Sequence, residues 1–216
     1  MIIIPRKPRV WFPGAIYHIM VRGNNKQNIF ISDKDYSKFL SILKETQKKH
    51  PFILHSYCLM TNHIHLQIET IDTNISSIMS VLLRNYSIYY NSEHEFIGHV
   101  FQSRFQSLLI EDDPYFLQTN RYIHLNPYKA MIVSNPGDYE YSSYRDYLNQ
   151  SQTRFASQAL MQVANHDLIK NSNMVNTEFT LKFFNGDLEK YRLFVEGESA
   201  DSSIEDAIRA DLREND

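Results

Sequence analysis

The segment from residue 52 to residue 70 constrains the fold most, because it contains two strand-like runs separated by only two residues. The runs are FILHSYCLM and HIHLQIET, and Thr61 and Asn62 lie between them. This pattern is typical of two β-strands joined by a tight turn. In the second run polar residues alternate with apolar ones, so a period of two places the polar set on one face of the strand and the apolar set on the other.

Runs on either side of this pair predict two more strands and two helices. AIYHIMVRG reads as a strand that ends at Gly23, and Asp33 then opens a helix with an apolar stripe. TNISSIMSVLLRNYSIYYN has helical spacing, and RFQSLLIE reads as a fourth strand. The resulting order, β-α-β-β-α-β, predicts an α+β fold of the ferredoxin-like or RRM-like type, in which helices cover one face of an antiparallel sheet.

The chain beyond the fourth strand is predicted to be mostly helical. Asp113 is expected to be an N-cap, followed by Pro114 at the first helical position. The polar stretch LNQSQTRFASQ, which begins at residue 148, predicts a linker. We therefore expect a domain over residues 1–148 and an acidic, mostly helical appendage over residues 149–216. With 216 residues, 43% of them hydrophobic, the chain can bury a real core.

Several features favour a cytoplasmic location. The opening run MIII before Pro5 is too short for a signal peptide, and no run approaches the ~18 apolar residues of a membrane helix. Cys58 is the single cysteine, so a disulfide framework is impossible and a reduced compartment is expected. Its apolar surroundings predict a small buried side chain.

The distribution of charge matters more than the net charge of -3. Residues 1–50 carry ten Lys and Arg against three Asp and Glu, a net of +7, whereas residues 151–216 carry seven against twelve, a net of -5. A basic segment that includes Arg6, Lys7, Arg9, Arg22 and Lys26 can neutralise phosphates and attract nucleic acid. The alternative is that the later lysines of this segment form the solvated face of an amphipathic helix.

His63 and His65 are candidate metal ligands. They share the polar face of their strand, about 6.6 Å apart along it, a separation at which two imidazoles can lean onto one ion. The alternative is two histidines that are exposed or hydrogen-bonded to other groups, because this triplet is common.

Tyr122 and Asn126 are candidate partners of the histidines. They lie four residues apart and share a helix face with Tyr115 and Thr119, so a helix along the polar sheet face could present both to the histidines. Pro127 disfavours helical geometry for the residue before it, which predicts Asn126 in the last turn or at a kink. The alternative is that this stripe packs in the core.

Several motifs resemble those of the REP-associated tyrosine transposases, within the single-tyrosine HUH transposases. They are YHIMVRGNNKQNIF, YCLMTNHIHLQIE, GHVFQSRFQSLLI, RYIHLNPYKAMIV and DYEYSSYRDY, and the resemblance covers about residues 10 to 148. It implies that His63 and His65 bind a divalent metal, that Tyr122 attacks DNA and that Asn126 completes the metal site. Thr61 stands where the family often has proline, and Phe101 where it often has tryptophan.

The resemblance implies a DNA endonuclease and strand transferase that acts on single-stranded, hairpin-associated sites. Cleavage would proceed through a 5'-phosphotyrosine, with Mg²⁺ or Mn²⁺ as the cofactor. Contacts to DNA are expected from a basic groove with aromatics near it, Tyr17, Phe101 and Phe105. The alternative, which is the more common one for any single aromatic, is that it packs in the core and that Arg104 braces the sheet. The polar residues of that groove would be Arg6, Lys7, Arg9, Arg22, Asn24, Lys26 and Arg104.

Two other functions compete with this one. A zinc hydrolase built on His63 and His65 would use a metal-bound water and would not need Tyr122. A catalytically silent nucleic-acid-binding module is also consistent with the RRM-like order of elements. The sequence is compatible with a monomer and with a homodimer.

Overall fold

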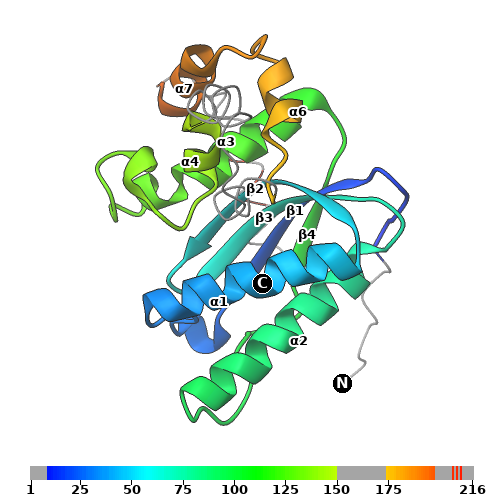
Figure 1. Cartoon of the computed structure of the whole chain (residues 1–216), viewed down its shortest axis with the longest axis vertical. Coiled ribbons are helices and arrows are strands. Elements are labelled where there is room, and N and C mark those ends of the chain that lie inside the picture. Colours follow the sequence, from blue (N-terminus) through cyan, green and yellow to red (C-terminus); the bar gives the residue numbers. More distant parts are fainter. Residues whose placement is uncertain (1–8, 150–173, 198–205, 207, 209, 211–216) are drawn as a thin grey trace, which may run out of the picture.

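A four-stranded antiparallel sheet forms the centre of the protein, as the sequence predicts (Figure 1). The computed structural model describes residues 9–149 and 174–197 and positions 206, 208 and 210. The strand order is β2-β3-β1-β4, in which each strand is antiparallel to its neighbours. The strands are β1 (Ile16–Arg22), β2 (Phe52–Met60), β3 (His63–Thr70) and β4 (Gln106–Ile110). Thr61 and Asn62 form the predicted turn between β2 and β3.

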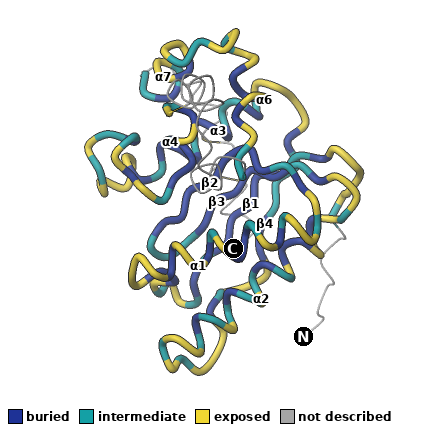
Figure 2. Tube along the Cα trace, viewed as in Figure 1, coloured by how far each residue is buried: buried dark blue, intermediate teal, exposed yellow. Residues whose placement is uncertain are grey.

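Two helices cover one face of the sheet, α1 (Asp33–Lys49) and α2 (Ile75–Glu93) (Figure 1). The apolar set of β3 points toward them, and the same alternation in β1 adds Tyr17, Ile19 and Val21 to this core. Figure 2 shows the resulting buried layer along the strands. The sequence prediction that helices cover the apolar face is therefore confirmed.

Asp35 joins α1 to α2 through hydrogen bonds. It forms a capping box with Ser32 at the start of α1, and its carboxylate accepts hydrogen bonds from Tyr89 of α2 and from His94, just after α2. Burial raises the pKa of this carboxyl, but the hydrogen bonds that it accepts lower the pKa by more, so the net pKa is below its ordinary value. These contacts tie the two helices together beneath the sheet.

On the opposite face of the sheet α3 (Asp113–Lys129) lies mainly over β2 and β3, so many side chains of that face are buried. Asp112, one residue earlier than predicted, is the N-cap of α3 and accepts a hydrogen bond from the backbone of Tyr115. The helix continues through Pro127, and Asn126 lies in its last turn as expected.

Short helices pack on the outer side of α3 (Figure 1). They share with α3 an apolar cluster that includes Leu125, Tyr147 and Val195. The hydroxyl of Tyr191 donates to the Asn120 side chain and is hydrogen-bonded to His124, and both of these partners lie on α3. The remaining elements are η1 (Asn24–Lys26), η2 (Pro136–Asp138), α4 (Tyr144–Leu148), α6 (Thr177–Lys182) and α7 (Leu188–Glu196).

The boundary near residue 148 stays a prediction, because most of the linker stretch lies outside the described residues. Cys58 is fully buried, which confirms its prediction as a small core side chain. Among the helices of the described residues, none combines the length and the apolar character that a membrane crossing requires.

Candidate active site

Three histidines, not two, meet on the face of the sheet beneath α3. The rings of His63 and His65 have centroids 5.0 Å apart and planes at 89°. His18, from the neighbouring strand β1, places its Nε2 3.0 Å from Nδ1 of His65. The antiparallel pairing of β1 with β3 aligns Met20 with His65, so His18 reaches His65 diagonally across the two strands.

Burial keeps these three rings in the neutral form at neutral pH. It lowers the pKa of His63 to about 4, with a further contribution from the nearby charge of Arg22. It lowers the pKa of His65 well below the ordinary value and that of His18 to about 3. A histidine must be neutral to offer a lone pair to a metal, so the rings are ready to act as ligands without losing a proton.

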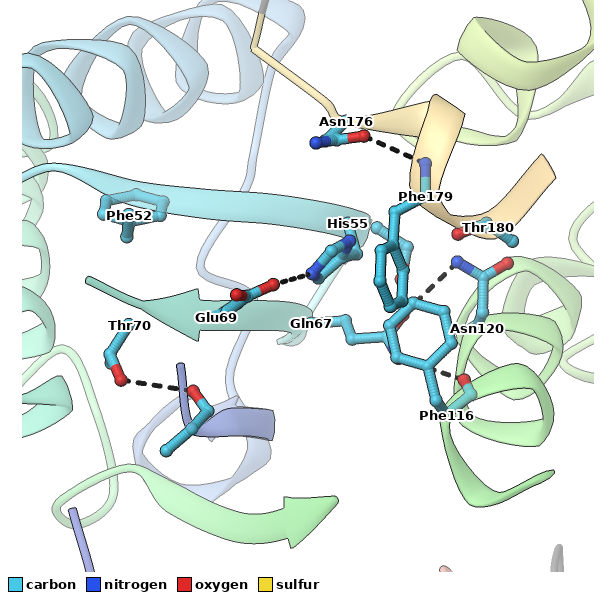
Figure 3. Close-up of polar contacts among 12 residues, drawn as sticks. Phe52, His55, Gln67, Glu69, Thr70, Phe116, Asn120, Asn176, Phe179 and Thr180 are labelled. Carbon is cyan, nitrogen blue, oxygen red and sulfur yellow. Dashed lines mark hydrogen bonds and ion pairs between the residues drawn. The ribbon is translucent and has the colours of Figure 1, made fainter. Parts of the chain in front are cut away.

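Gln67 docks α3 onto β3 (Figure 3). It follows His65 on the same face of the strand, and its side-chain nitrogen donates to the carbonyl of Phe116, 3.0 Å away. Its side-chain oxygen accepts hydrogen bonds from Asn120 and from Ser56 of β2. One fully buried amide therefore ties the strand of the histidines to the helix of Tyr122.

Tyr122 lies against two of the histidines. Its ring centroid is 5.6 Å from that of His65 at 87°, and 5.8 Å from that of His18 at 68°. The ring is partly buried, in a cluster with Met20 and Ile208. Lys129, near the end of the same helix, places its Nζ 6.0 Å from the ring centroid of Tyr122. A positive charge thus lies beside the phenol ring of Tyr122.

Asn126 lies one helical turn beyond Tyr122. Its Nδ2 donates to the backbone carbonyl of Tyr122 at 2.8 Å, an arrangement that leaves the side-chain oxygen Oδ1 as the atom available to a cation. The described residues contain no group of three or more His, Cys, Asp and Glu that could hold a metal. A site built on His63 and His65 would therefore need a ligand of another type, and an amide oxygen fits.

The residues expected to bind DNA occupy different surroundings. Arg22 ends β1 near the histidines, Asn24 and Lys26 form the short helix η1, and Arg104 is exposed just before β4. Arg9 stacks on Phe105 and donates a hydrogen bond to Ser107, so it holds the N-terminal segment against β4. Arg6 and Lys7 lie outside the described residues.

The aromatic residues expected to stack on bases are mostly packed inside the protein. Tyr17 and Phe105 are buried and Phe101 packs against the core, so Tyr17 and Phe105 are core residues, the alternative to base stacking. Trp11 and Phe12, which the sequence analysis did not single out, are 39% and 48% exposed next to Arg9. Adjacent aromatics in a basic segment were the signal that could have identified them.

Three comparisons with known proteins each find similarity to transposases. The family described as "Transposase IS200 like" matches residues 12–126. A Haemophilus influenzae protein assigned to the REP-associated tyrosine transposases is 25% identical over 142 residues, which cover 61% of this chain and 80% of that protein. A solved structure of a REP-associated tyrosine transposase bound to a REP hairpin superimposes with a TM-score of 0.58 at 16% identity, covering 68% of this chain and 87% of that one. At this identity the superposition shows a shared fold alone.

Proposed function

The chain belongs to the family of IS200-like transposases, and from this premise we propose that it cleaves and rejoins single-stranded DNA with Tyr122 as its nucleophile. The observation that carries the proposal is the position of the Tyr122 ring, which lies edge-on against His65 and His18 on the covered face of the sheet. A tyrosine that only filled the core would not need two neutral imidazoles and a lysine around it.

The reaction conserves the number of phosphoester bonds. The Tyr122 oxygen forms a bond to phosphorus while the bond from phosphorus to the 3' oxygen breaks, and the proton lost by the tyrosine is balanced by the one gained at the 3'-OH. The product is a 5'-phosphotyrosine and a free 3'-OH. Because the linkage is of similar energy to the one broken, a 3'-OH can attack it in turn and join the strands.

His63, His65 and Asn126 are the proposed ligands of a divalent cation, Mg²⁺ or Mn²⁺. Two neutral nitrogens and one amide oxygen fit such an ion, and the nitrogens favour Mn²⁺ over Mg²⁺. When bound, the ion would neutralise charge on the non-bridging oxygens of the scissile phosphate. The protein itself holds the two imidazoles at a fixed angle and keeps the phenol ring of Tyr122 beside that of His65.

A DNA hairpin with a single-stranded flank is the proposed substrate. The similar solved structure is bound to a REP hairpin, which supports this class of substrate for the present chain. The exposed Arg104, the η1 segment with Lys26, and the aromatics Trp11 and Phe12 would contact its backbone and bases. The cytoplasmic location also stays a prediction.

A covalent adduct assay tests the proposal. The protein would be incubated with a library of single-stranded hairpin DNAs and Mn²⁺, and attached DNA would be sequenced after denaturation. We expect an adduct that depends on Tyr122. A zinc hydrolase or a silent RNA- or DNA-binding module would form none, so a library in which no adduct accumulates would contradict the proposal.

A further inference from the structure

Asn62, the last residue of the turn before β3, lies between a backbone carbonyl and the first candidate ligand. Its side-chain Nδ2 donates to the carbonyl oxygen of Lys26 at 3.3 Å, and its Oδ1 is 2.7 Å from Nδ1 of His63. A second hydrogen bond holds the same loop to the turn, because the backbone N–H of Gly23 donates to the carbonyl of Asn62 at 2.8 Å. Asn62 therefore connects the loop after β1 to the His63 ring.

These contacts determine which nitrogen of His63 carries the proton. A carbonyl oxygen accepts hydrogen bonds only, so the contact with Lys26 must use the NH₂ group of Asn62, and Oδ1 is left to face the ring. An amide oxygen also accepts only, so Nδ1 of His63 must carry the hydrogen. The lone pair of the neutral ring is then on Nε2, the nitrogen that points away from the turn.

His18 makes the equivalent contact with His65, but with a partner that can either donate or accept. The distance from Nε2 of His18 to Nδ1 of His65 is 3.0 Å, and both rings are almost completely buried. If His65 donates from Nδ1, its Nε2 has a lone pair for a cation. If His18 donates instead, Nε2 of His65 carries a hydrogen and cannot bind one.

His18 is itself unsuited to be a third ligand. Its Nε2 is engaged by His65, and its Nδ1 is buried without a hydrogen-bond partner. A buried imidazole nitrogen without a hydrogen-bond partner lowers the stability of the folded protein. An apolar side chain would fill the same space without this loss if the ring served only to pack. A role in orienting His65 accounts for a polar ring at this buried position.

We propose that Asn62 and His18 are positioning residues, which hold His63 and His65 in the tautomer with hydrogen on Nδ1 and so direct both Nε2 atoms toward one cation. The inference rests on the proposed metal site. Asn62 enforces this tautomer with or without a cation, because the Lys26 carbonyl prevents its amide from turning over. His18 permits it, and cation binding at Nε2 of His65 selects the direction of their hydrogen bond.

Mn²⁺ binding by pairs of variants tests the positioning role without measuring cleavage. Asn62→Asp and His18→Gln keep an acceptor oxygen for the ligand ring, whereas Asn62→Leu and His18→Leu are similar in size and offer none. We expect the two leucine variants to bind Mn²⁺ about 10 to 100 times more weakly than wild type in an EPR titration, and the two acceptor variants to bind within a few-fold of it. Leucine variants with wild-type Mn²⁺ affinity would overturn the proposal.

Nitrogen-15 NMR of the imidazoles separates this proposal from the proposed metal site. In metal-free wild type, His63 should show hydrogen on Nδ1, and Asn62→Leu should give a mixture of tautomers. This result is expected even if the protein binds no Mn²⁺, in which case the metal site fails and the positioning role of Asn62 stands. A His63 ring whose tautomer is the same in wild type and Asn62→Leu would overturn the role of Asn62 whatever the metal does. Thermal unfolding of His18→Leu and His18→Gln shows whether each variant is folded in the Mn²⁺ titration. If His18→Leu binds Mn²⁺ weakly because His65 has lost its orientation, the variant should be folded and His18→Gln should restore the affinity.

Discussion

His65 and Tyr122 meet edge to face, with ring centroids 5.6 Å apart and planes at 87°. One belongs to the strand β3 and the other to the helix α3, so their contact depends on how the helix is docked on the sheet. The docking is specified by buried hydrogen bonds of Gln67, and each part of this arrangement has a measurable consequence.

Replacement of Tyr122 by phenylalanine should eliminate the covalent DNA adduct and leave hairpin binding within about two-fold, because the change removes one hydroxyl and retains the ring. Tyr128→Phe is the matched control, since Tyr128 is on the same helix but is 50% exposed and is not among the residues packed at the site. Mass spectrometry of the trapped adduct identifies the attached residue. A phosphotyrosine at any residue other than Tyr122 would contradict the assignment.

Chelation should abolish adduct formation, and so should His63→Ala, because the proposed cation would lose a ligand. His63 is partly exposed, so we expect the free energy of unfolding of the variant to fall by less than about 1 kcal/mol. Urea unfolding and adduct assays on the same samples provide both values. If wild type still forms the adduct after exhaustive chelation, the prediction is wrong.

Gln67→Leu should loosen the docking of α3. Three buried groups each lose one hydrogen bond, the Ser56 hydroxyl, the Asn120 amide and the Phe116 carbonyl, and we expect a loss of about 2 to 4 kcal/mol in the free energy of unfolding. The rate of adduct formation should fall even at temperatures where the variant is folded. Glu69→Gln is the control, because Glu69 is on the same face of β3 and bonds to His55 instead of α3. Equal rates for both variants would contradict the docking role.

Acid should destabilise the protein through His124. Burial lowers the pKa of His124 to about 3, while the unfolded chain takes up the proton near pH 6.5. The unfolded state therefore binds more protons between these values, and stability falls as pH drops from 6.5 toward 3. From pH 7 to pH 5 this residue should contribute a loss of about 2 kcal/mol. His124→Gln should show a correspondingly smaller loss in urea unfolding, and an unchanged loss would contradict the prediction.

Binding to single-stranded DNA should weaken with salt. About four to six phosphate contacts predict that log affinity falls against log salt with a slope near -3 to -4, at about 0.7 per contact. Arg104→Ala should reduce that slope by about 0.7 without changing sequence preference. Arg145→Ala is the control, because the Arg145 side chain is bonded to Gly137, Asp138 and Glu140. Fluorescence anisotropy at several salt concentrations measures both slopes, and an affinity independent of salt would rule out the proposed interface.

Local periodicity predicted the elements and the face of the sheet on which His63 and His65 lie. The alternation of HIHLQIET placed His63 and His65 on the face away from α1 and α2, and the structure confirms it. The third histidine was missed, because nothing in AIYHIMVRG reveals which strand will pair with β1 or in what register. Contacts of that kind join residues far apart in the sequence, and periodicity is silent about them.

The role of Asn62 could not be predicted for a related reason. An asparagine between two strands is an ordinary turn residue, and its place in the sequence indicates no further role. Its contact with Lys26 forms because the loop after β1 folds against the turn, where the N–H of Gly23 donates to the carbonyl of Asn62. The loop itself is tight, since a Cβ atom on Gly23 would come within 2.3 Å of the carbonyl oxygen of Gln27. The glycine is visible in the sequence, but the neighbour that requires it is not.

The hydroxyl of Tyr191 holds two side chains of α3, Asn120 and His124, from a position late in the chain. A nonsense mutation anywhere between codon 150 and codon 190 would remove Tyr191 together with α7 and expose the apolar cluster that α7 shares with α3. We therefore expect such alleles to behave as complete loss of function in a genetic screen. A gene that ended there would encode no smaller working enzyme.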